Sequence, residues 1–287
     1  MSVEDPSVSS LTEEPHRHST SHPPPPESTT HTNTQPPSYL HSQHQNRLYT
    51  KLPLPPKPQE SIRILFNNVN ALEIETEAAL AKSMNNYMKH DPTILGLMET
   101  KRNFRLQEKT TKPLRQMVQA CLQTPAKIKM VTSSCYEEHT ARTLKTPGGV
   151  CQFILNTILS LHKASGSDDL GRWVWQEVRI DGSRSLYVIT AYRVCPKPTN
   201  STKMTTAWHQ QYRGLRARGI RNPDPRQYFF SDLGKFLTKI HNKGSDYILG
   251  MDANDPYDHD DIQDFFQDHD MVDVYSDFME ERPATHF

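Results

Sequence analysis

Three apolar stretches of the sequence each end in side chains that carry oxygen, and this pattern limits the folds open to the chain. The stretches are rich in β-branched and aliphatic residues and are short, as buried strands are. The oxygen-bearing residues at their ends are Asn68 and Asn70, then Glu99, then Asp252 and Asn254. The sequence therefore predicts three strands that present polar groups where they stop.

The spacing of these polar residues suggests how they lie. In an extended chain, residues two apart point to the same face, so we expect Asn68 beside Asn70 and Asp252 beside Asn254. With Glu99 near them, the side chains would form a cluster of hard oxygen atoms suited to Mg²⁺ or Mn²⁺. Each piece alone also fits an ordinary turn, because Asn and Asp are common turn residues.

The segments between these strands predict a mixed α/β arrangement. Helices are expected over 73–90, 111–123 and 224–244, and further strands over 126–134 and 148–155. Asp224 and Pro225 are typical of a helix start, and Gly244 of the position past a helix end. Alternating runs on both sides of Asp181-Gly182 predict a hairpin. Strands joined partly by helices and partly by a hairpin indicate an α/β sandwich with mixed sheets.

Residues 1–60 differ from the rest of the 287-residue chain in composition. They hold twelve of the 22 prolines, with much Ser, Thr, His and Gln and few aliphatic residues. Such a segment cannot bury enough apolar area to offset its ordering entropy, so we expect it to be disordered. Its proline runs predict polyproline II, as a linker or as a ligand of an SH3- or WW-type partner. Residues 61–287 suit one α/β domain.

Charge is patterned along the chain, although Lys and Arg (33) balance Asp and Glu (33). Residues 209–227, which we expect to form a basic loop, carry Arg213, Arg216, Arg218, Arg221 and Arg226. Residues 252–281 carry twelve Asp and Glu and no Lys or Arg. This pattern fits a protein that grips a phosphate backbone near a metal site. It also fits two solvated surfaces of opposite charge.

Cysteine usage and hydropathy predict a soluble intracellular protein that does not enter membranes. The four cysteines lie far apart and lack the spacing of zinc ligands, as expected of free thiols in a reducing compartment. No apolar stretch approaches about 18 residues, and the N-terminus lacks the apolar region of a signal peptide. If the substrate is DNA, a nuclear location is expected. The sequence gives no signal for the oligomeric state.

Six motifs, in order, resemble the endonuclease/exonuclease/phosphatase superfamily with its DNase I-like fold. They are ILFNNVNAL, ILGLMETK, TPGGVCQFI, LYVITAYRV, YILGMDAN and RPATHF. Within the superfamily they are most similar to the apurinic-type endonuclease domains of non-LTR retrotransposons. The resemblance implies a four-layered α/β sandwich with two packed sheets, dependence on Mg²⁺ or Mn²⁺, and cleavage of phosphodiester bonds in DNA.

The resemblance also implies roles for residues at the motif positions. Glu99 resembles the principal metal ligand, and Asn68 its neighbour at the metal site. Tyr192 matches the tyrosine that contacts the scissile phosphate. Asp252 matches the aspartate that activates water, and Asn254 the amide that positions phosphate and aspartate. The expected phosphate and DNA contacts are Asn70, Arg213, Arg216, Arg218 and Arg221.

Two departures from the superfamily pattern affect the expected activity. Met251 stands where the superfamily has glycine before the catalytic aspartate, so its side chain is expected to crowd the strand end. The sequence stops at Phe287, before two strands that in the superfamily supply an Asp and a His, so we expect a domain incomplete at its C-terminus.

These departures leave three alternatives. The first is an endonuclease that is weak or inactive as this chain. The second is a catalytically dead remnant that binds nucleic acid or metal. The third is a phosphatase of the same fold.

Overall fold

The computed structural model describes residues 56–58, 61–73, 76–122, 127–135, 143–197 and 206–274. All of them lie in the second of two units into which the chain divides, Tyr49–Phe287. The proline-rich segment predicted to be disordered falls outside the described residues, apart from 56–58. The RPATHF motif also lies outside them.

Two four-stranded sheets form the centre of this unit. The first has the order β1-β2-β4-β3, with β1 at Ile64–Asn68, β2 at Ile94–Met98, β4 at Val150–Leu155 and β3 at Ile128–Ser133. The second has the order β5-β6-β7-β8, with β5 at His162–Ser167, β6 at Trp173–Asp181, β7 at Arg184–Tyr192 and β8 at Asp246–Asp252. β1 and β2 are parallel, as are β7 and β8, and the other pairs are antiparallel. Both sheets are therefore mixed, as predicted.

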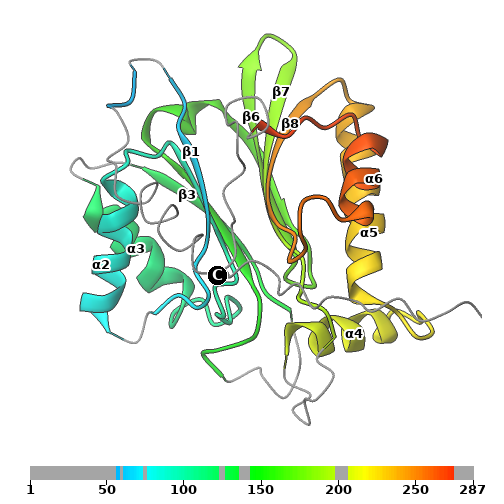
Figure 1. The fold of residues 1–287 in the computed structure, drawn as a ribbon. Coiled ribbons are helices and arrows are strands. Elements are labelled where there is room, and N and C mark those ends of the chain that lie inside the picture. Colours follow the sequence, from blue (N-terminus) through cyan, green and yellow to red (C-terminus); the bar gives the residue numbers. More distant parts are fainter. Residues whose placement is uncertain are drawn as a thin grey trace, which may run out of the picture. The chain divides into compact units, whose positions relative to one another are not determined.

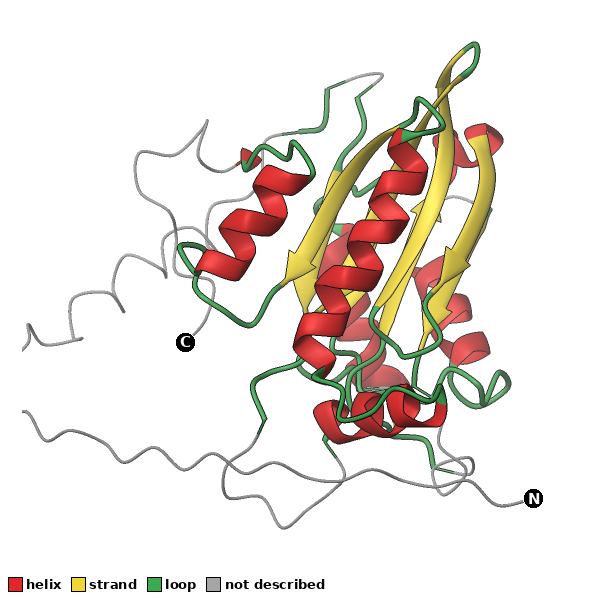
Figure 2. Ribbon diagram, turned by 90° about the vertical axis from the view of Figure 1, so that its right-hand side faces the viewer, coloured by secondary structure: helices red, strands yellow, loops and turns green. Residues whose placement is uncertain are grey.

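Helices cover the outer face of each sheet (Figure 1). The helices of the first sheet are α2 (Glu77–Met88) and α3 (Thr111–Cys121), and those of the second are α5 (Pro225–His241) and α6 (Asp260–Asp268). Figure 2, seen from the side of α5 and α6, shows a long helix in front of the sheet that runs nearly along the strands. The resulting order of helices, sheet, sheet and helices confirms the four-layered sandwich. A 3₁₀ helix, η2 (Asn156–Leu161), joins β4 to β5 across the two sheets.

Alternation along the strands produces the apolar layers between these elements. In β2, Leu95 and Leu97 pack with α2 and α3, whereas Ile94 and Met98 belong to clusters between the sheets. A side chain at Gly96 would place its Cβ 2.3 Å from the hydroxyl oxygen of Thr190 on the second sheet. Glycine at this position therefore lets the two sheets approach closely.

Met251 does not crowd the end of β8, contrary to the sequence-based expectation. Its side chain packs in the cluster formed by the second sheet with α5 and α6. The neighbouring Gly250 faces the first sheet, where an added Cβ would lie 2.2 Å from Phe66. Because alternate residues of a strand point to opposite faces, the position that requires glycine is Gly250.

Several local predictions are confirmed, and one is wrong. The Asp224 side chain caps α5 by accepting from the backbone N–H of Arg226 at 2.8 Å. The hairpin joins β6 to β7 at Gly182, whose φ is 30°. The basic stretch 209–227 was expected to be a loop, but it contains most of α4 (Ala207–Ala217) and the start of α5. Trp208 and Leu215 of α4 are buried in the core. The mostly polar composition of the helix gives no sign of this burial in the sequence.

Two further findings concern hydropathy and cysteines. In the part of the chain that the structure describes, no helix is long and apolar enough to cross a membrane. All four cysteines are free thiols, of which Cys135 and Cys151 are buried and Cys195 is exposed.

Candidate active site

The polar ends of four strands meet at one edge of the sandwich. Parallel pairing places Asn68 opposite Met98, so Glu99 follows directly beside the end of β1. In the second sheet, parallel pairing places Tyr192 opposite Asp252. The ends of neighbouring parallel strands lie together, and this brings side chains from distant parts of the sequence to one place.

The side-chain amide of Asn68 connects the two carboxylates of this edge. Its nitrogen donates to Glu99 Oε2 at 3.1 Å and to Asp252 Oδ2. Its oxygen accepts from the backbone N–H of Asn70 at 2.8 Å. Asp252 is only 8% exposed, so a donor shared with Glu99 offsets part of the cost of burying one carboxylate near another. In this arrangement Asn68 orients the acids and turns its nitrogen toward them.

The second members of the two motif pairs lie in turns instead of on the strands. β1 ends at Asn68 and β8 at Asp252, while Asn70 and Asn254 have φ angles of 40° and 50°. Each turn is closed by a side chain that accepts from the N–H two residues on: Asn68 from Asn70 and Asp252 from Asn254. The period-two expectation is therefore wrong for both pairs, because local side-chain hydrogen bonds replace the extended chain.

The backbone around Glu99 is held in an uncommon conformation. Glu99 and Lys101 both have a φ of 51°, which non-glycine residues rarely adopt and which is concentrated at functional sites. The carbonyl of Glu99 accepts from the N–H of Ala71 at 2.9 Å. The N–H groups of Thr100 and Lys101 donate to the carbonyls of Gly149 and Gly148. These bonds fix the direction in which Glu99 points.

Tyr192 stands buried beside the acids. Burial, followed by the charge of Glu99, raises the pKa of the Tyr192 phenol well above its ordinary value. A phenol is protonated at neutral pH even at its ordinary pKa, so the hydroxyl can donate there, and the raised pKa extends this to alkaline solution. Partial burial and Glu99 also raise the pKa of the nearby Cys195 thiol.

Asn254 is held by backbone and thiol groups. Its side-chain nitrogen donates to the carbonyl of Arg193 at 2.6 Å, and its oxygen accepts from Cys195 Sγ at 3.2 Å. An amide nitrogen carries two N–H groups, so the second can donate to a ligand.

A buried ion-pair network supports this loop, and the sequence did not reveal it. The carboxylate of Asp255 pairs with Arg193 and Arg226, whose side chains are 2% and 10% exposed. Arg226 also donates to the carbonyls of Val194 and Asn254. From sequence, Arg226 belonged to the basic surface stretch. No pattern in one sequence distinguishes a buried arginine from an exposed one when its partners are distant.

Lys101 is the other site residue to which sequence reasoning gave no role. Its ammonium lies 3.1 Å from Glu99 Oε1 and donates to Asn70 Oδ1. The sequence did contain a signal for a site role of Lys101, because Lys101 is the last residue of the E-T-K motif.

The predicted DNA-binding arginines lie on α4 and in the segment after it. The helix begins beside the site, because Trp208 packs in one cluster with Tyr192. Arg213 is half-buried, Arg216 and Arg221 are exposed, and Arg218 forms an exposed ion pair with Asp169. The structure brings these residues together at the strand ends: Asn68, Asn70, Glu99, Tyr192, Asp252 and Asn254.

The donor set fits a hard divalent cation that keeps much of its water. Glu99 and Asp252 supply two carboxylates, Asn70 supplies an amide oxygen, and the Glu99 side chain is 18% exposed. Magnesium is commonly held by one or two carboxylates together with waters and substrate phosphate. Among the described residues, no group of three or more His, Cys, Asp or Glu side chains is placed to hold a metal ion. The residues therefore suit an open site and not a closed protein cage.

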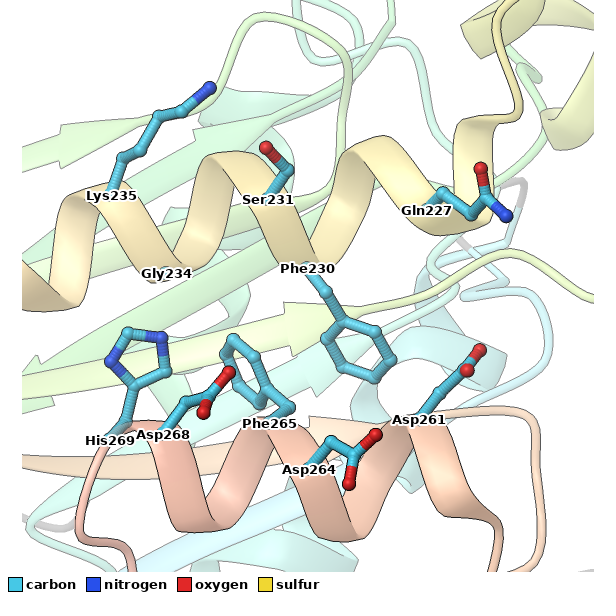
Figure 3. A pocket seen from close by; sticks show the side chains of 10 residues that line it. All are labelled: Gln227, Phe230, Ser231, Gly234, Lys235, Asp261, Asp264, Phe265, Asp268 and His269. Atoms are coloured by element: carbon cyan, nitrogen blue, oxygen red, sulfur yellow. The ribbon is translucent and has the colours of Figure 1, made fainter.

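A cavity of about 410 Å³ lies elsewhere, between α5 and α6 (Figure 3). Phe230 and Phe265 form its apolar floor, and Asp261, Asp264 and Asp268 line it from α6. None of the strand-end residues lines this cavity.

Comparison with known proteins gives structural matches alone. No protein-family model matches the sequence, and no curated protein does. The structure is similar to the AP endonuclease LMAP from Leishmania major, with a TM-score of 0.51, 14% identity, and coverage of 75% of this chain and 69% of that one. The catalytic domain of human Nocturnin gives a TM-score of 0.48, 15% identity, and coverage of 76% and 73%.

The similarity to LMAP, at low identity, shows the fold. An endonuclease/exonuclease/phosphatase family protein from Leptotrichia buccalis C-1013-b also matches, with a TM-score of 0.33, 13% identity, and coverage of 57% of this chain and 65% of that one. With its two mixed sheets between helices, the chain has a DNase I-like α/β fold.

Proposed function

We propose that this chain is a divalent-metal-dependent phosphodiesterase that cleaves DNA, an endonuclease of the kind found in non-LTR retrotransposons. The observation that carries the proposal is the Asn68 amide, which holds Glu99 and Asp252 together at the strand ends. Beside them lies Tyr192, a buried phenol that stays protonated. Paired carboxylates next to a neutral donor suit a reaction in which water attacks a phosphate diester.

Each residue has a separate task in the proposed reaction. Asp252 takes a proton from the attacking water, since a carboxylate within hydrogen-bond reach acts as a general base. The water oxygen bonds to phosphorus as one P–O ester bond breaks, and the leaving oxygen takes a proton from solvent. Asn68 keeps this carboxylate in position. Tyr192 and Asn254 donate hydrogen bonds to phosphate oxygens as negative charge builds there. Bound at Glu99, Mg²⁺ or Mn²⁺ would supply a positive charge that stabilises the phosphoryl oxygens.

Support for DNA as the substrate comes from the motifs and from charge. The N-x-N and E-T-K motifs resemble those of retrotransposon endonucleases, and LMAP is an AP endonuclease. Arg216 is exposed on α4, which starts beside Tyr192, and Arg221 is exposed in the segment after α4. Both can contact a phosphate backbone.

The test is nicking of supercoiled plasmid in Mg²⁺ by the full chain and three variants. Glu99→Gln and Asp252→Asn should lower the rate by about 10²-fold or more, the usual effect of losing a general base or a charge-stabilising group. Asp246→Asn is the matched control, because Asp246 lies at the opposite end of β8 in an exposed pair with Arg184. Absence of nicking by the unmodified chain, or equal nicking by all four proteins, would overturn the proposal.

A phosphomonoester assay separates the phosphatase of the same fold from the nuclease. The nuclease proposal expects plasmid nicking without release of phosphate from p-nitrophenyl phosphate. If the chain hydrolyses the small phosphomonoester and leaves DNA intact, the site is a phosphatase.

A further inference from the structure

Both oxygens of the Glu99 carboxylate are already engaged by groups of this chain. Oε2 accepts from Asn68 at 3.1 Å, and Oε1 lies 3.1 Å from the ammonium of Lys101. The same ammonium donates to the side-chain oxygen of Asn70. Lys101 thus stands between a carboxylate oxygen and an amide oxygen, which are the kinds of atoms that a magnesium ion takes as ligands.

The backbone at Lys101 is held by its neighbours, while the side chain is partly exposed. Glu99 and Lys101 share a φ of 51°, and the N–H of Lys101 donates to the carbonyl of Gly148 at 2.7 Å. A Cβ on Gly149 would lie 2.9 Å from the hydroxyl oxygen of Thr100, so the glycine lets the two segments approach. The Lys101 side chain is 37% exposed, which leaves the ammonium room to move outward.

We propose that Lys101 is a built-in competitor of the divalent cation at this site. Its ammonium occupies the Glu99 and Asn70 oxygens while the cation is absent, and it moves away when the cation binds. Two positive charges on one carboxylate repel each other, so the cation must displace Lys101. The competition sets the affinity for the cation lower than the two carboxylates alone would give. The inference rests on the proposed metal dependence of the site.

Manganese binding to the purified full chain tests the competition without any measurement of activity. The dissociation constant for Mn²⁺ is measured by electron paramagnetic resonance for the unmodified chain, Lys101→Met, Lys101→Arg and Glu99→Gln. Lys101→Met should bind Mn²⁺ about two- to five-fold more tightly, the range expected when a partly exposed ion pair no longer competes. Lys101→Arg should bind like the unmodified chain, and Glu99→Gln should lose most of the binding.

Lys197→Met is the matched control for loss of one positive charge near the site. The Lys197 ammonium lies over the Trp208 ring at 5.4 Å and not on a carboxylate, so its loss should change Mn²⁺ affinity less than two-fold. Thermal unfolding of each variant shows that it is folded. Equal tightening by Lys101→Met and Lys197→Met would assign the effect to overall charge and overturn the inference.

The outcomes separate this inference from the proposed function. If the unmodified chain and Lys101→Met bind Mn²⁺ equally well, the competition is wrong while the metal site stands. If only Lys101→Met binds measurably, the competition is supported. If neither protein binds Mn²⁺, the competition is wrong, and failure to nick plasmid in Mg²⁺ then decides separately against the proposed function.

Discussion

The side-chain amide of Asn68 reaches from the end of β1 in one sheet to Asp252 at the end of β8 in the other, 184 residues away. The same nitrogen donates to Glu99 at 3.1 Å. One amide nitrogen carries two N–H groups, so each carboxylate receives one. The bond therefore joins the two sheets at the point where the proposed chemistry takes place.

Replacing Asn68 by alanine should lower the stability of the fold more than replacing its neighbour Asn67, which bonds to a neutral group. Hydrogen bonds to charged groups contribute more than neutral ones, and we expect a loss of about 1–3 kcal/mol in the free energy of unfolding, measured with urea. Asn67→Ala is the control, because Asn67 donates to the neutral hydroxyl of Tyr87 at 2.7 Å. The cost of Asn68→Ala should shrink in an Asp252→Ala background. If Asn68→Ala lowers the free energy of unfolding no more than Asn67→Ala does, the hydrogen bonds from Asn68 to the two carboxylates do not stabilise the fold as we expect.

The sequence predicted the strands of the site well, because each is a short apolar run with its polar residues directly at its end. It failed just beyond the strands. The turn at Asn254 depends on a hydrogen bond to Asp252, and a positive φ cannot be inferred from alternation. Arg226 was assigned to the surface because its acceptors, among them the carbonyl of Val194, come together only in the folded chain.

The sequence did not predict the helix α4, for a related reason. Its buried face includes Gln210 and Gln211 beside Trp208, so few apolar residues mark this segment as a helix. Packing of Trp208 and Leu215 in the core stabilises the segment as a helix.

The Asp255 network should be a larger source of stability than the ion pairs on the surface. Asp255→Asn removes the carboxylate that Arg193 and Arg226 share, and breaking a buried pair typically costs about 3–5 kcal/mol. Asp169→Asn is the control, since Asp169 pairs with Arg218 in solvent and such a pair contributes less than about 1 kcal/mol. Denaturant unfolding compares the two. Equal losses in the free energy of unfolding would show that the buried network stabilises the fold no more than a surface ion pair does.

Cys195 should react slowly with iodoacetamide although it is exposed. Partial burial and Glu99 raise the pKa of its thiol, and only the thiolate reacts, so less of it is reactive at pH 8 than for a free cysteine. In metal-free buffer, Glu99→Gln should speed labelling and move the pH at which labelling rises to lower values. Mass spectrometry of the labelled chain, with Cys195→Ser to identify the site, gives the rate.

The distant Asp246→Asn variant controls for a general change in charge. It should leave the labelling rate of Cys195 as it is in the unmodified chain. If Glu99→Gln labels no faster than Asp246→Asn, then Glu99 does not act on the thiol as the structure indicates.

The exposed arginines after the start of α4 should account for part of the salt dependence of DNA binding. Arg216→Ala and Arg221→Ala should each weaken binding to duplex DNA of any sequence and reduce the slope of log K against log salt by about 1, as one lost phosphate contact does. Binding is measured by fluorescence anisotropy without divalent cations, over a series of KCl concentrations. Arg184→Ala is the control, because Arg184 is exposed at the opposite end of β7 and pairs with Asp246. A slope that is the same in all four proteins would place the DNA on another surface.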